Sequence, residues 1–286
     1  MNRLATIIAA TLLVTFAIAA SSLAGMREDI RFHLSMRAGG NQVDLAFDRV
    51  GHDQNHVNSA MPIADLRGLW PSALRSAQQV PISFAIERAP GRVDCRGVAI
   101  RGTADGSCGF TRSAAFDARL AHVGYPLLDD DQQFTLTMTN FDPAVIDALK
   151  AGGYRAPDAG GLVSLGIFSI DAAYVRDIAA AGFRLGSAND LVQFKIAKVT
   201  PALIAAYRQL GYDHLSVDDV TAMGIQGVTP SFILGFAQAG FRNIPASKLI
   251  QLKIFGVTPE DARAMKRRSG GEISADALIR HKLLGA

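Results

Sequence analysis

The sequence predicts an α+β fold, in which a small antiparallel β domain precedes an α-solenoid of helical hairpins. Two observations predict it: β-favouring residues alternate with polar ones over residues 26–139, and a 29-residue pattern recurs five times over residues 140–286. A third observation, an apolar stretch over residues 1–25, sets that segment apart from both domains.

The composition is that of a folded protein without a nucleic-acid surface. About half of the 286 residues are apolar and the formal net charge is +3, so the chain is long enough for two cores. Lysines and arginines are scattered apart from Lys266, Arg267 and Arg268, whereas nucleic-acid binding needs a denser basic face. We therefore expect no nucleic-acid partner.

Residues 1–25 have the pattern of a secretory signal peptide. One positive charge at Arg3 is followed by an apolar run that ends in small residues, with candidate cleavage points after Ala19 and Ala24. An uncleaved anchor is the alternative, because roughly 20 apolar residues can span a bilayer. We expect an exported protein, either periplasmic or anchored to the inner membrane and facing the periplasm, with membrane contact only through residues 1–25.

The segment 26–139 contains short runs of β-favouring residues separated by Gly, Asn, Asp and Pro, which predict five to seven antiparallel strands in a sandwich or a curled sheet. The runs are RFHLSM, VDLAFD, VPISFAI, VDCRGVAI and FTLTM. PIADLRGLWPSAL is expected to cross the sheet as a loop with one helical turn, and Trp70 to fill the core.

The two cysteines, Cys95 and Cys108, fall in a predicted β-hairpin that turns near Arg101 and Gly102. In that hairpin they lie opposite each other, close enough for a disulfide in an oxidising compartment. Two free, buried thiols are the alternative.

The repeated segments, such as KVTPALIAAYRQLGY and GVTPSFILGFAQAGF, each predict the start of a helix. An oxygen-bearing side chain can accept a hydrogen bond from a free backbone N–H of the first turn, and the proline that often follows has no N–H to leave unpaired. The two columns are Asp142, Asp171, Thr200, Thr229 and Thr258, followed by Pro143, Ala172, Pro201, Pro230 and Pro259.

Each first helix is predicted to end at a glycine, followed by an aromatic residue that packs back on the last turn. These pairs are Gly153–Tyr154, Gly182–Phe183, Gly211–Tyr212 and Gly240–Phe241. A second helix follows, with two apolar columns on neighbouring parts of one face. The columns are Leu162, Leu191, Val220, Leu249 and Leu278, then Ile167, Ile196, Ile225, Ile254 and Leu283.

Such short hairpins bury their apolar faces only by stacking, which predicts one continuous solenoid of five repeats with a polar last copy as its cap. The repeated aromatic residues are expected to belong to the core. Lys195, Lys253 and Lys282 share a column on the second helix. A solvated face is the main interpretation of these lysines, and an anionic partner site is the alternative.

Few residues suggest chemistry. The string HDQNH, from His52 to His56, resembles a zinc-protease motif, but its neighbours favour a polar loop between strands. The three aspartates at 129–131 are expected to form a polar turn before a strand, because they lack the alternate spacing of a calcium loop. We therefore predict no catalytic, cofactor-binding or metal-binding residues and no cofactor.

The tandem VTPxxI pattern with GY or GF, LS and DDL resembles a family of uncharacterised bacterial exported proteins. In that family it follows a β-rich segment of the form PIADLRGL, VPISFAIERAPGRVDCRGVAIRG and GSCGF. Similar repeats also occur appended to membrane metallopeptidases of the antibiotic-sensing antirepressor type. The resemblance implies a solenoid in a cell-envelope context, and the zinc-binding HExxH of those peptidases has no counterpart in this chain.

Taken together, these patterns predict a non-enzymatic exported module that binds or scaffolds a protein or peptide through the repeat surface. An envelope sensor or regulator that acts with a membrane metallopeptidase is the alternative. A metal-dependent hydrolase around His52 and His56 is a second alternative.

Overall fold

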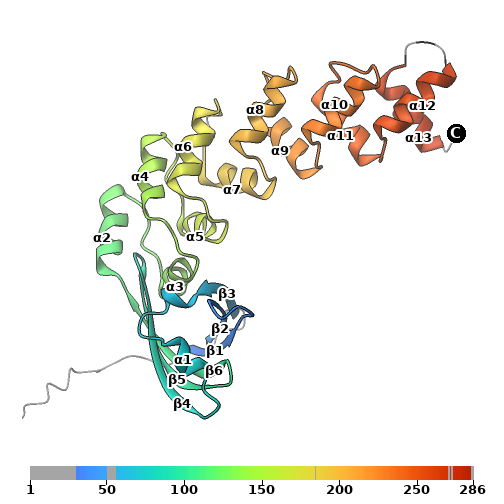
Figure 1. Ribbon diagram of the computed structural model, residues 1–286. Coiled ribbons are helices and arrows are strands. Elements are labelled where there is room, and N and C mark those ends of the chain that lie inside the picture. The colour runs from blue at the N-terminus through green and yellow to red at the C-terminus, as the bar shows by residue number, and fades with distance from the viewer. Residues whose placement is uncertain (1–29, 50–55, 184, 270, 272, 285–286) are drawn as a thin grey trace, which may run out of the picture.

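The computed structural model describes residues 30–49, 56–183, 185–269, 271 and 273–284. The predicted signal segment and His52 lie outside the described residues. The described chain is α+β: one antiparallel sheet is followed by a row of helices that leads away from it (Figure 1).

The β domain is a single curled sheet of six strands in the order β3-β2-β1-β6-β5-β4, in which all neighbouring strands are antiparallel. The strands are β1 (Ile30–Met36), β2 (Gln42–Arg49), β3 (His56–Pro62), β4 (Val80–Arg88), β5 (Gly91–Ile100) and β6 (Thr103–Arg112). A 3-10 turn η1 (Ile63–Asp65) and a short helix α1 (Pro71–Leu74) connect β3 to β4, in the place predicted for a crossing loop with one helical turn.

The sheet is amphipathic because its side chains alternate between two faces. In β1, Ile30, Phe32 and Leu34 are buried while Arg31 and His33 are exposed. The buried face forms one core with Leu74 of α1 and with side chains of helix α3 (Asp130–Met138). The sheet therefore has one face that is covered by helices and one face that is exposed to solvent.

The hairpin of β5 and β6 confirms the predicted pairing of the cysteines. Arg101 and Gly102 both have positive φ, which matches the tight turn between Ile100 and Thr103. Cys95 lies opposite Cys108 in the register, their Cα atoms are 4.1 Å apart, and a disulfide joins them.

Two predictions about where strands lie in this domain are wrong. The run FTLTM is not a strand but the end of helix α3, because Asp129 and Gln132 form a capping box that starts a helix just before it. Asn58 and Ser59, two of the neighbours of HDQNH that favoured a polar loop, belong to strand β3, because β2 pairs with the backbone of both residues. In both places a contact outside the run overrides its intrinsic preference.

Twelve helices of the described chain follow the sheet. They are α2 (Ala114–Val123), α3, α4 (Ala144–Ala151), α5 (Ala159–Ile167), α6 (Ala172–Ala180), α7 (Ala188–Ile196), α8 (Pro201–Gln209), α9 (Val217–Ile225), α10 (Pro230–Gln238), α11 (Ala246–Ile254), α12 (Pro259–Ser269) and α13 (Ala275–Leu284). We call the even-numbered ones first helices and the odd-numbered ones, from α3 onward, second helices. All six second helices begin 29 residues apart.

The helix ends follow the predicted chemistry. Thr200 and Thr229 accept hydrogen bonds from the backbone N–H groups of Leu203 and Phe232. Gly153, Gly182, Gly211 and Gly240 all have positive φ. The aromatic residues that follow these glycines are buried or pack against the helical core, as predicted.

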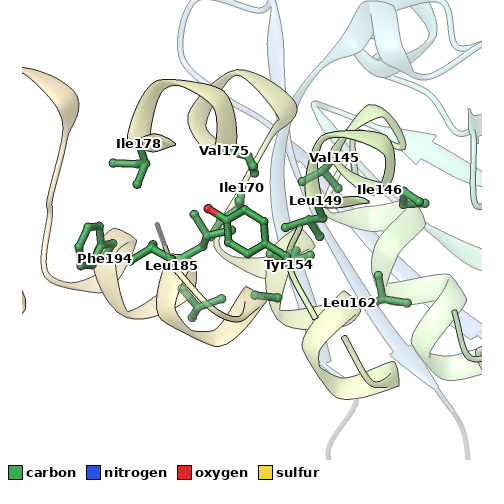
Figure 2. Packing of buried hydrophobic residues seen from close by; sticks show 14 of the residues in the cluster. Val145, Ile146, Leu149, Tyr154, Leu162, Ile170, Val175, Ile178, Leu185 and Phe194 are labelled. Carbon is green, nitrogen blue, oxygen red and sulfur yellow. The ribbon is translucent and has the colours of Figure 1, made fainter. Parts of the chain in front are cut away.

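The helices are arranged in two rows, because consecutive second helices contact one another and so do the first helices from α4 to α6 and from α8 to α12. The array bends away from the β domain, and the second helices lie on the inner side of the bend (Figure 1). Between the rows, Leu149, Tyr154, Ile170 and Leu185 form part of a continuous apolar core (Figure 2).

Candidate functional site

An exposed apolar stripe runs along the second helices. The first predicted apolar column of these helices is buried, but the second one is between 53 % and 62 % exposed. We call this second column the isoleucine stripe; it comprises Ile167, Ile196, Ile225, Ile254 and Leu283. The expectation of a shared buried face was wrong, because five residues along a helix turn the side chain by about 140°.

The stripe lies on the face of the second helices that is turned away from the core. Residues two turns earlier on the same face are also exposed, and they are polar or glycine. They are Gly160, Asn189, Asp218, Ser247 and Asp276. The stripe therefore follows the C-terminal ends of the second helices, with a polar margin at their N-terminal ends.

A groove of about 440 Å³ opens between two members of the stripe, Ile196 and Ile225. Leu203 and Met223 contribute to its wall, and Tyr207 also lines it. Burial raises the pKa of Tyr207 to about 12, and its hydroxyl donates to the carbonyl of Val228 at 2.5 Å. Tyr207 is thus a neutral structural phenol and not an acid or base at neutral pH.

Gly224, at the groove, lets α9 pack closely against the end of α7. A Cβ on Gly224 would lie 2.4 Å from the carbonyl oxygen of Ala197, so any larger residue would push α9 away from the end of α7. Of the described residues that line the groove, Lys198 alone is charged. The groove is therefore an apolar recess with one cation at its edge.

The lysine column has partners within its own hairpins. The ammonium of Lys195 lies 4.7 Å from the ring centroid of Tyr174, and that of Lys253 lies 4.8 Å from the ring centroid of Phe232. Lys282 pairs with Asp261 at 3.0 Å. These contacts tie second helices to first helices, which favours the solvated structural interpretation over an anionic partner site.

The pattern of caps extends one hairpin further toward the N-terminus than the five segments aligned from the sequence. Ser113 caps α2, Gly124 ends it with a φ of 76°, and Asp129 caps α3. These positions stand 29 residues before Asp142, Gly153 and Asp158. The repeated cap residues of this hairpin are present in the sequence, but the β-favouring run FTLTM led to the prediction of a strand there.

In this additional hairpin the β domain covers the face that is open on the other second helices. Met138 stands at the stripe position of α3 and is buried in the core of the sheet. Phe134, one turn earlier, packs edge-to-face on Phe47 and Phe110, with ring centroids 5.8 Å and 5.5 Å away. Arg49 forms an ion pair with Asp131, two turns before Met138.

The other residues considered for chemistry are not brought together. His56 begins β3 with its backbone opposite Asp48, and the three aspartates at 129–131 form the cap and first turn of α3. Within the described ranges, three metal-ligating side chains are nowhere close enough to hold an ion.

Trp70 is 73 % exposed, so its predicted core position was wrong; Leu69 and Leu74 fill the core at that place instead.

A second recess, of about 460 Å³, lies near the start of α9 and has both polar and apolar side chains in its wall. Arg208 donates to the carbonyl of Ala181 at 2.6 Å, and Ser216 and Asp219 form the capping box of α9. Its polar groups thus form hydrogen bonds at helix ends.

Over the described residues, no single helix is long and apolar enough to cross a bilayer; α9 and α10 reach that length and composition only as a pair bent by 88°.

The chain matches none of the family models, curated proteins or solved structures with which it was compared.

Proposed function

We propose that residues 111–284 form a solenoid of six 29-residue helical hairpins, and that this solenoid is the binding part of a non-enzymatic exported scaffold of the bacterial cell envelope. The caps that recur at a fixed step support the solenoid, because each hairpin buries its apolar side against its neighbours. The sequence alone suggested five hairpins, and the caps of α2 and α3 add the sixth.

The isoleucine stripe is the observation that carries the proposed binding. A branched aliphatic residue occupies the same outward position in five consecutive hairpins and is more than half exposed in each. Scattered exposed apolar residues are ordinary, but a contiguous row of them is typical of an interaction surface. The row belongs to the second helices, which lie on the inner side of the bend, where a partner can contact several hairpins at once (Figure 1).

Export is the second part of the proposal. It rests on the signal-like residues 1–25 and is compatible with the disulfide between Cys95 and Cys108, since disulfides persist in oxidising compartments.

Site-specific photo-cross-linking in intact cells tests the proposal. With a photoreactive residue in place of Ile196 or Ile225, we expect discrete protein adducts, recovered from the envelope fraction. Leu234 is the control, because it is exposed on a first helix outside the stripe. Adducts that are equally abundant at Leu234, or a product confined to the cytoplasm, would count against the proposal.

A further inference from the structure

We propose that the isoleucine stripe and its groove receive an amphipathic α-helix of a partner protein. That helix presents a large apolar side chain about every seven residues, and a carboxylate next to the side chain that enters the groove. This inference rests on the proposed function and specifies the partner of the same surface. Three observations carry it: the spacing of the stripe, its continuity with the covered face of α3, and the charge at the groove.

The spacing of the stripe fits a helix. Packed helices lie about 8–10 Å apart, and consecutive second helices are in contact, so one stripe residue follows the next at about that distance. Seven residues of an α-helix rise about 10.5 Å, whereas side chains on one face of a β-strand recur about every 6.6 Å. A helix laid across the second helices thus meets each stripe residue with one side chain.

The covered face of α3 shows that this surface accepts apolar groups. Phe134 and Met138 lie on the same side of α3 as the stripe on the other second helices, and the sheet buries both. Phe47 and Phe110 reach over Phe134 from the sheet. The stripe continues the position of Met138 along the array, and beyond α3 the described chain leaves the side chains at that position more than half exposed.

The charge at the groove defines the flank of the partner helix. Lys198 lies at the groove beside Ile196, so a carboxylate next to the inserted side chain gains a charge-assisted contact. A bilayer could offer both apolar groups and phosphates, but the stripe belongs to the second helices, which lie on the inner side of a bend (Figure 1). A narrow rod reaches a row on the inside of a bend more readily than a flat surface does.

Binding of a designed peptide to the full mature chain tests the inference. The probe is a fluorescent amphipathic helix of about 22 residues, with leucine at every seventh position and glutamate beside each leucine. We expect the double variant Ile196→Ser with Ile225→Ser to weaken binding at least tenfold in fluorescence anisotropy. Leu234→Ser should stay within twofold of the unmodified protein. All three residues are exposed, and circular dichroism checks that the variants remain folded.

A charge swap tests the assignment of the flank. Lys198→Glu should weaken binding of the glutamate peptide several-fold, and the peptide with lysine in place of glutamate should regain it. A peptide with the same composition but leucine at every fifth position is the spacing control and should bind at least tenfold more weakly.

Other outcomes overturn the inference. Equal binding to all variants, or none to the unmodified protein, refutes the helix. Capture by phosphatidylglycerol vesicles that depends on Ile196 and Ile225 assigns the stripe to a membrane, and self-association that depends on them assigns it to a second copy. Protein adducts in the cross-linking experiment together with a failed peptide refute only the helix and leave the proposed function standing.

Discussion

At the scale of single residues, one column was not recognised from the sequence: the residue that ends each second helix. This residue has positive φ at all five described positions, although three of them are not glycine. The column is Asn140, Ser169, Lys198, Gly227 and Gly256. The left-handed conformation is unfavourable for residues with a Cβ, so Ser169 and Lys198 hold strained backbone that the packing of the next buried residue maintains.

Ser169→Gly is therefore expected to stabilise the protein. Removing the Cβ relieves roughly 1–2 kcal/mol of left-handed strain, and the greater freedom of glycine in the unfolded chain offsets about 0.4–1 kcal/mol of that gain. The free energy of unfolding should rise by up to about 1.5 kcal/mol in urea denaturation. Gly227→Ser is the reverse change in the same column and should lower it by a similar amount; a loss in both variants would contradict the explanation.

At the scale of elements, the sequence predicted a helix or strand correctly where nearby residues alone determine it. Thr200 and Pro201 are enough to predict the start of a helix, and the pairing of the two cysteines follows from the register of one hairpin. Phe134 was not readable in this way, because its run favours a strand and only the cap at Asp129 makes it helical. The exposure of Ile196 was missed because an apolar pattern identifies a helix, while the neighbouring helices decide which apolar positions are covered.

The junction between α3 and the sheet leads to a prediction about Arg88. Its guanidinium donates to the carbonyl oxygens of Thr137 and Met138, at 2.9 Å each. These two carbonyls lie at the end of α3 and have no partner within the helix. Arg88→Leu should lower the free energy of unfolding by about 1.5–3 kcal/mol, the range for hydrogen bonds to charged groups. Urea denaturation followed by circular dichroism measures it.

Arg92→Leu is the matched control on the next strand. Arg92 pairs with Asp94 at the surface, and exposed ion pairs contribute about 0–1 kcal/mol. Equal losses for the two variants would mean that Arg88 does not hold α3 to the sheet.

At the scale of the whole molecule, the helices form a row in which each hairpin contacts mainly its neighbours. One end is fixed, because α3 shares its core with the sheet. The other end, at α12 and α13, has a neighbour on one side only, and α12 buries only Ala262. Stability should therefore fall toward the C-terminus, and the effect of a lesion should depend on its place in the row.

Gly211→Val and Gly256→Val test this dependence on position. Both glycines have positive φ, of 87° and 64°, and a Cβ at either would meet open space. The local strain of a β-branched residue is therefore similar at the two sites, on the order of 1–2 kcal/mol or more. Any difference in stability between the two variants then reflects how much the neighbouring hairpins depend on each site.

In hydrogen exchange, Gly211→Val should speed exchange in hairpins on both sides, from α6 to α11, because a central hairpin supports two neighbours. Gly256→Val should loosen only the last two hairpins, since few contacts lie beyond it. Equal and purely local effects would show that the hairpins are independent. The stripe would then not be held as one surface, and both the solenoid and the helix-binding proposal built on it would fail.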